Sequence, residues 1–108
     1  MTKTRQGLIG IDIGTSATKV LVIDDTGAIR ARHTEGYPLA TPQPGWAEQD
    51  PAHWWQAVAT GLEAVRATLD GSLEIKAIGL SGQMHGLVPL DAADTVIRPA
   101  ILWHDQRT

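Results

Sequence analysis

A carboxylate and a hydroxyl-rich turn stand together near the start of this sequence. Asp12 closes an apolar run, and Gly14, Thr15 and Ser16 follow it. A carboxylate at the end of an apolar strand is costly unless a cation, hydrogen-bond donors or water stabilise it. Gly14 can take a positive φ, and the turn after it can present N–H groups and hydroxyls to an anion. An ordinary hairpin in which Asp12 bonds the turn amides is an equal alternative.

A second polar cluster, Gln83-Met84-His85, follows the apolar run from Ile75 to Leu80. If that run and the run that ends at Asp12 are parallel neighbours, their carboxyl ends meet and one cleft holds both clusters. The amide and the imidazole can hydrogen-bond a polyol while Met84 covers its carbon face. A lone histidine that satisfies a loop is an equal alternative for His85.

Other chemistries find little support in the sequence. The four histidines lack zinc-ligand spacing, and there is no cysteine for thiol catalysis or thiolate metal binding. Neither phosphate-binding glycine motif, Gly-x-x-x-x-Gly-Lys-Ser/Thr or Gly-x-Gly-x-x-Gly, is present. A second wall of the cleft could be formed by Trp103, Asp105 and Arg107. The alternative is that Asp105 and Arg107 are an ordinary surface ion pair.

Length and charge restrict the class of protein. The 108 residues, 43% of them hydrophobic, suffice for one globular domain. The net charge is −3 and the nine basic residues are scattered, which argues against a nucleic-acid partner or an acidic membrane surface. No signal peptide and no run of about 20 apolar residues is present, so a cytoplasmic location without membrane contact is expected.

The first third of the chain predicts three strands. The stretch from Gly7 to Asp24 reads as two strands buried on both faces around the turn at Gly14. Asp24-Asp25-Thr26-Gly27 is a turn signal, and a metal pair is the less favoured interpretation. Ala28 to Thr34 reads as a third strand, whose arginines suit a solvated edge. Together these strands form an antiparallel meander.

The middle of the chain predicts a loop, a helix and a further strand. Gly36 to Gln49 contains three prolines, so we expect neither strand nor helix there. Asp50 is a good N-cap, and Gly71 is a plausible C′ residue for the helix between them. The expected apolar stripe of that helix is Trp55, Val58, Leu62, Val65 and Leu69. A strand after a helix indicates a parallel crossover, so the fold class is α/β with a mixed sheet, three antiparallel strands and then parallel additions.

Four stretches together resemble a known family. Ile11-Asp12-Ile13-Gly14-Thr15-Ser16 with Lys19 resembles the first phosphate element of actin-like, ribonuclease H-like ATPases. The remaining stretches are similar to the amino-terminal part of the FGGY carbohydrate kinases, and Gln-Met-His-Gly most resembles xylulokinases. These stretches are Gly45–Pro51 with Trp54-Trp55, Gly82–Gly86, and Arg98–Arg107. The last departs from the pattern at His104, where Asn is expected.

The resemblance implies a division of roles between two ribonuclease H-like domains. Residues 1–108 would be the amino-terminal part of the first domain, and an absent second domain would hold the adenosine site and the general base. Asp12 would hold Mg²⁺ through water. Gly14, Thr15 and Ser16 would approach the transferred phosphate of ATP, with Lys19 as a charge partner. The implied sugar contacts are Gln83, Met84, His85, Trp103 and Asp105.

The activity implied by the resemblance is ATP-dependent phosphorylation of a pentulose, D-xylulose to D-xylulose 5-phosphate, by the complete protein. The partners would be a sugar and ATP, and exposed surface of the incomplete domain would favour self-association, for example as a homodimer. These 108 residues alone are expected to be inactive. The alternatives are a kinase for ribulose, glycerol or gluconate, and a non-catalytic actin-like domain that senses a sugar.

Overall fold

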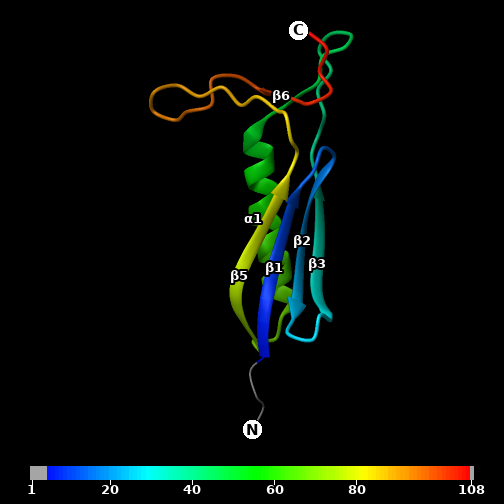
Figure 1. The fold of residues 1–108 in the computed structure, drawn as a ribbon, viewed down its shortest axis with the longest axis vertical. Coiled ribbons are helices and arrows are strands. Elements are labelled where there is room, and N and C mark those ends of the chain that lie inside the picture. Colours follow the sequence, from blue (N-terminus) through cyan, green and yellow to red (C-terminus); the bar gives the residue numbers. More distant parts are fainter. Residues whose placement is uncertain (1–4, 108) are drawn as a thin grey trace.

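The computed structural model describes residues 5–107 as a four-stranded sheet with one helix packed on one face (Figure 1). The sheet order is β3-β2-β1-β5. The first three strands pair antiparallel and β5 pairs parallel with β1, which confirms the predicted mixed sheet. The bounds are β1 (Arg5–Ile13), β2 (Ala17–Asp24), β3 (Ile29–Gly36) and β5 (Leu73–Gly82).

The helix α1 (Pro51–Thr68) begins where the sequence predicts. The side chain of Asp50 accepts a hydrogen bond from the N–H of Ala52 at 2.9 Å, and proline occupies the first helical position. Leu69 is the C-cap and has extended backbone, so the C′ residue is Asp70, and the prediction of Gly71 at C′ is wrong by one residue.

The main core lies between α1 and the sheet. It contains Val20 and Val22 of β2 and Val58 and Val65 of α1, all buried. Leu62 and Leu69 pack against this core at its margin. Trp55, predicted to face the core, is 70% exposed, so the apolar stripe of α1 is shorter than its spacing indicates.

The opposite face of the sheet is uncovered among residues 5–107, because α1 is the only helix described there. β1 and β2 alternate between buried and exposed residues, so the prediction that both of their faces are buried is wrong for this chain. β5 is exposed on both faces, and Ile78 and Leu80 are 55% and 75% exposed. The predicted solvated edge at β3 is confirmed by the strand order.

A small second sheet lies beyond the carboxyl end of β5. The chain leaves β5 in a long excursion and returns through β6 (Ala100–Ile101), which pairs antiparallel with β4 (Glu48–Gln49) (Figure 1). The prolines end before Glu48, which leaves its N–H free to pair. The prediction that no strand occurs up to Gln49 is therefore wrong at these last two residues.

The turn predicted at Asp24 is confirmed. One oxygen of the Asp24 carboxylate accepts from the N–H and hydroxyl of Thr26 and from the N–H of Ala28, and the other pairs with Arg30 at 3.2 Å. Among the described residues, no set of three or more potential metal ligands is found here or elsewhere. In the same part of the chain, no helix has the length and apolarity to cross a membrane.

Candidate functional site

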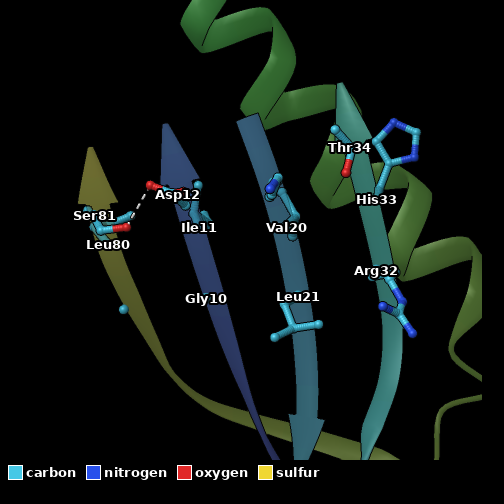
Figure 2. Close-up of a pocket in the computed structure, with 12 residues that line it drawn as sticks. Gly10, Ile11, Asp12, Val20, Leu21, Arg32, His33, Thr34, Leu80 and Ser81 are labelled. Atoms are coloured by element: carbon cyan, nitrogen blue, oxygen red, sulfur yellow. Dashed lines mark hydrogen bonds between the residues drawn. The ribbon is translucent and has the colours of Figure 1, made fainter. Parts of the chain in front are cut away.

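Asp12 lies at the carboxyl end of β1, between two strands that each present a polar partner. Its register partner on β5 is Ser81 and its partner on β2 is Lys19. The Ser81 hydroxyl donates to Asp12 Oδ1 at 2.8 Å (Figure 2). In residues 5–107 no other hydrogen bond to this exposed carboxylate is found. The second carboxylate oxygen is therefore open to a ligand.

Asp12 borders two cavities. The larger, of about 640 Å³, extends down the uncovered face of the sheet over β1, β2, β3 and β5 (Figure 2). Lys19 and Arg32 also line it, so this cavity has basic side chains as well as the Asp12 carboxylate. The smaller cavity, of about 380 Å³, lies beyond the strand ends. Asp12 is thus the residue that both cavities share.

The smaller cavity brings together both polar clusters of the sequence, except that Ser16 and the predicted charge partner Lys19 do not line it. Its lining consists of Asp12, Gly14, Thr15, Gly82, Gln83, Met84, His85 and Trp103. The clusters meet because β1 and β5 are parallel neighbours, which is the condition that the sequence analysis set for a shared cleft. An acid, a turn with free backbone polarity, a thioether and an imidazole therefore surround one space large enough for a small polyol.

The turn after β1 is held tightly by its neighbours. The N–H of Gly14 donates to the Ala17 carbonyl at 2.9 Å, and the Tyr37 hydroxyl donates to the Gly14 carbonyl. The N–H of Tyr37 donates to the Ser16 carbonyl at 3.2 Å. Gly14 does not have the positive φ that we expected. A Cβ atom there would lie 3.0 Å from the Ala17 carbonyl oxygen, so a larger residue would require the turn to shift.

Tyr37 stays a donor to this turn. Burial raises the pKa of its phenol, the Thr18 hydroxyl opposes that shift, and the charge of Asp12 raises it further. The phenol is therefore protonated throughout the physiological range. The sequence analysis missed Tyr37 because it lies in the loop after β3, where no spacing rule points to the turn at Gly14.

Met84 and His85 project into the smaller cavity from the turn after β5. Met84 is 69% exposed, and His85 has a φ of 60°, in the left-handed region that non-glycine residues seldom adopt. Backbone strain of this kind is concentrated at functional sites. His85 is also exposed and lines the cavity, so a ligand can reach its side chain.

Gln83 and Thr15, predicted as sugar and phosphate contacts, bond each other. The Thr15 hydroxyl donates to Gln83 Oε1 at 3.2 Å and accepts from Trp103 Nε1 at 3.1 Å. Gln83 Nε2 donates to Gln49 Oε1 at 3.2 Å. Trp103 is 57% exposed at the rim of the cavity. The indole, the hydroxyl and the two amides thus form one connected hydrogen-bonded wall.

Asp105 differs from the other predicted sugar contacts, because it does not line the cavity. Its carboxylate accepts from the N–H of Ala47 at 2.7 Å and from the backbone and guanidinium of Arg107. Arg107 also bonds Glu48 at 2.8 Å and lies 3.7 Å from the centre of the Trp46 ring. Arg107 and these N–H groups hold the pKa of Asp105 well below its usual range, against a smaller opposing effect of burial.

The contacts of Asp105 described above stabilise the strand pair β4–β6. This strand pair in turn positions Trp103 at the cavity. The N–H of Leu102 donates to the Ala47 carbonyl at 3.0 Å, and that of Gln106 to the Gly45 carbonyl at 2.7 Å. Leu102 packs with Ala47, Ala100 and Trp54 in a second apolar cluster. Trp54 is therefore the member of the tryptophan pair that packs inward.

Ser81 and Gln49 are further residues that sequence reasoning missed. Ser81 could have been found by extending the parallel pairing of β1 and β5 to the strand ends, since it is the register partner of Asp12. Gln49 gave no signal, because a glutamine before a helix N-cap has no characteristic chemistry.

The donor set at Asp12 suits a magnesium ion held largely by water. Magnesium binds through one or two carboxylates, keeps several waters, and is completed by substrate phosphates. Asp12 offers one oxygen free of protein contacts among residues 5–107, beside a turn that can receive phosphate. A fully protein-built metal cage is not formed in this part of the chain.

Comparison with known proteins agrees with this arrangement. Residues 8–108 match the FGGY family of carbohydrate kinases, N-terminal domain. Xylulose kinase of Escherichia coli K12 is 46% identical over 99 residues, which are 92% of this chain and 20% of that protein. The chain spans about a fifth of the length of the relatives it matches.

Two solved structures share the fold. The crystal structure of xylulose kinase from Rhodospirillum rubrum superposes with a TM-score of 0.90 at 32% identity, covering 94% of this chain and 21% of that one. Gluconate kinase from Lactobacillus acidophilus gives 0.87 at 36% identity, with 94% and 20% covered. A family match over nearly the whole sequence, with the same fold in sugar kinases, shows that this chain belongs to the FGGY family of carbohydrate kinases.

Proposed function

We propose that the protein containing this chain transfers the γ-phosphoryl group of ATP to a hydroxyl of a pentulose, D-xylulose in the first instance. The observation that carries the proposal is the cavity shared by Asp12, the turn at Thr15 and the Met84-His85 pair. It juxtaposes groups suited to phosphate with groups suited to a polyol. Phosphoryl transfer depends mainly on such positioning and on charge stabilisation.

Each residue of the site has a defined part in the proposed reaction. Asp12 would hold Mg²⁺ through water, and that ion would neutralise charge on the phosphates of ATP. The N–H groups of Thr15 and Ser16, for which no backbone partner is found among residues 5–107, would receive oxygens of the transferred group. Lys19 would be a further positive charge beside Asp12. The general base is proposed to lie in a second domain outside this chain.

The sugar half of the cavity would recognise an uncharged chain of hydroxyls. His85 can donate to and accept from a hydroxyl, while Met84 contacts carbon and excludes water. Trp103 supplies an apolar rim. The Gln-Met-His-Gly turn and the identity with xylulose kinases favour D-xylulose over other polyols.

The experiment is a kinetic comparison of D-xylulose, ribulose, glycerol and gluconate with ATP and Mg²⁺, using the full-length protein. We expect the highest kcat/KM with D-xylulose. The fold shared with gluconate kinase makes an aldonic acid the second candidate. Preference for any of the other three would overturn the xylulose assignment, and absence of phosphorylation with all four would favour a sugar-binding protein without catalysis.

A further inference from the structure

Gln49 is a polar side chain that no part of the proposed reaction uses, yet it is buried behind the site. It is 2% exposed, in the short strand β4. Its Nε2 donates to the Thr15 carbonyl, and its Oε1 accepts from Trp54 Nε1 at 2.9 Å and Gln83 Nε2 at 3.2 Å. One amide therefore contacts the turn after β1, the turn after β5 and the first turn of α1.

The direction of every bond in this group is fixed by chemistry. An indole N–H can only donate and a carbonyl can only accept, so Trp54 and Thr15 determine which end of the Gln49 amide is oxygen. Gln83 is fixed in the same way, since its Nε2 also faces the Gly14 carbonyl at 3.4 Å. Its Oε1 must then accept from the Thr15 hydroxyl.

Thr15, Gln49 and Gln83 thus form a closed ring of three hydrogen bonds. The ring runs from Gln49 to the Thr15 carbonyl, from the Thr15 hydroxyl to Gln83, and from Gln83 back to Gln49. The indoles of Trp54 and Trp103 donate into it from either side. A closed network in which every side-chain nitrogen and oxygen has a partner is more rigid than its separate bonds, and it specifies one geometry.

We propose that Gln49 is the positioning residue that fixes the phosphate turn relative to the sugar turn. This inference rests on the proposed function for its kinetic consequence. The Thr15 hydroxyl already donates one hydrogen bond and accepts another. The turn would therefore bind phosphate through its N–H groups. Because the Gln83 amide faces the ring, Gln83 would hold the turn that presents Met84 and His85 rather than bind the sugar itself.

Gln49→Glu and Gln49→Met in the full-length protein test the proposal. Glutamate keeps the acceptor for Trp54 and Gln83 but loses the donor to the Thr15 carbonyl, whereas methionine removes both. Displacement of a reacting group by about 1 Å can cost about 100-fold in rate. We expect both variants to lose about 10- to 100-fold in kcat, while the sugar dissociation constant changes far less. Gln56→Met, on the exposed side of α1, is the matched control and should retain activity.

Two indole resonances give a readout that does not depend on activity. Replacement of Trp54 and Trp103 by Phe assigns their ¹H–¹⁵N signals. Gln49→Met should shift both signals. Gln49→Glu should leave Trp54 hydrogen-bonded while shifting Trp103, which reports on the Thr15 turn. A change confined to Trp54 in both variants would mean that Gln49 acts only locally and would overturn the proposal.

A second pair of variants covers the case in which changes at the buried Gln49 prevent folding. Thr15→Val opens the ring at the partly exposed turn, and Thr15→Ser restores the hydroxyl. We expect valine to lower kcat and to shift the Trp103 signal, as the Gln49 variants do. Serine should keep the Trp103 signal near that of the unmodified protein and should lose less kcat than valine. Normal kcat in Thr15→Val or in Gln49→Glu contradicts the proposal. If the unmodified protein phosphorylates no sugar, the proposed function fails, and the indole signals alone decide the role of Gln49.

Discussion

Two regions of this chain are held together by different physics. The sheet–helix layer, formed by β1, β2, β3 and α1, is stabilised by contacts between aliphatic side chains such as Val20, Val22 and Val58. The turn assembly, formed by Asp12 at the end of β1 and by residues 14–16, 45–49, 81–87 and 98–107, is stabilised largely by directional bonds between amides, carboxylates and guanidinium groups. Apolar packing in the sheet–helix layer tolerates small rearrangements of side chains. The directional bonds of the turn assembly fix the positions of its groups.

The difference separates what each region contributes. Burial of apolar area is not directional, so the layer supplies stability and fixes where β1 ends. Hydrogen bonds to a carbonyl or carboxylate are directional, so the assembly sets the distances between groups in the cavity. Substitutions in the layer should therefore change the free energy of unfolding, and substitutions in the assembly should change kinetics.

The largest effect is expected for Asp12→Asn in the full-length protein. Loss of the charge that would hold Mg²⁺ acts on the transition state, so kcat should fall by about 10²–10³. Asp12 has one hydrogen bond in the described residues and is exposed, so stability should change little. Steady-state kinetics at saturating Mg²⁺ and calorimetric titration with the sugar would measure the two effects separately.

Near-normal turnover in Asp12→Asn would leave Asp12 as a structural residue of the strand end. Ser81→Ala is the accompanying variant, because it removes the one hydrogen bond to the carboxylate that the described residues make. It should lower kcat in the same direction by a smaller factor. A larger loss in Ser81→Ala than in Asp12→Asn would contradict the assignment.

The second-largest effect is expected in the layer, where Gly61→Ala should lower the stability of the protein. A Cβ atom there would lie 2.5 Å from Val20 Cγ2, because glycine lets α1 approach β2 closely. Overpacking costs about 1–3 kcal/mol and outweighs the roughly 1 kcal/mol gained in helix propensity. The apparent melting temperature should fall while kcat per folded molecule is retained.

Thr60→Ala on the exposed side of the same helix is the control for propensity alone. It should leave the melting temperature unchanged or slightly raised. If Gly61→Ala instead reduced kcat without changing the melting temperature, the separation of the two regions would be wrong.

The sequence was sufficient for most of the layer. Asp50 and Pro51 marked the start of α1, and the parallel addition of β5 to the sheet followed from the strand–helix–strand order, although that order did not give β1 as its neighbour. Two-faced burial could not be judged from apolar runs, because burial depends on what covers each face. The prediction that Trp55 faces the core was wrong for the same reason. Helical spacing gives the direction in which a side chain points, but it does not show whether another element packs there.

The turn assembly was predictable only in outline. The shared cavity followed from the parallel strands, since that rule fixes where strand ends meet. The partners of individual polar groups did not follow, because Gln49 and Tyr37 reach the turn across 34 and 23 residues of chain. Asp105 has the residue type of a sugar ligand, yet Ala47 and Arg107 occupy its oxygens.

A smaller effect is expected for His85→Gly, within the assembly. Glycine adopts the φ of 60° without strain, so stability should be maintained or raised. Loss of a hydrogen bond to a neutral hydroxyl costs about 0.5–1.5 kcal/mol, so the KM for the sugar should rise roughly 2- to 13-fold. The KM for ATP should be nearly constant.

His85→Asn is the matched variant, because asparagine tolerates the left-handed region and retains both a donor and an acceptor. Its KM for the sugar should lie between those of the unmodified protein and the glycine variant. An unchanged sugar KM in His85→Gly would remove the imidazole from the proposed sugar site.

The smallest effect is expected at Asp24, a polar network that belongs to the layer. Asp24 ends β2 opposite Gly7, at the far end of the sheet from Asp12. Hydrogen bonds from the hydroxyl and N–H of Thr26, supported by Ala28 and Arg30 and opposed by burial, lower its pKa to about 2. The unfolded chain has an ordinary value near 3.9.

This shift gives the sign of a pH dependence. A carboxyl group whose pKa is lower in the folded protein contributes stability above the unfolded value, and that contribution is lost as the pH falls toward the folded value. The stabilisation should therefore be complete above about pH 4 and disappear toward pH 2. Asp24→Asn should lower the melting temperature modestly at pH 7, because the amide oxygen can still accept from the Thr26 N–H.

The gap in melting temperature between the two proteins should narrow as the pH is lowered from about 4 toward 2, measured by calorimetry under reversible conditions. Turnover at pH 7 should be unchanged, because the bonds of Asp24 end within its own turn and at Arg30. A gap in melting temperature that stays constant with pH would mean that the charge of the Asp24 carboxylate contributes nothing to stability. A loss of turnover in Asp24→Asn would mean that directional hydrogen bonds set the geometry of the site whether they lie in the layer or in the turn assembly.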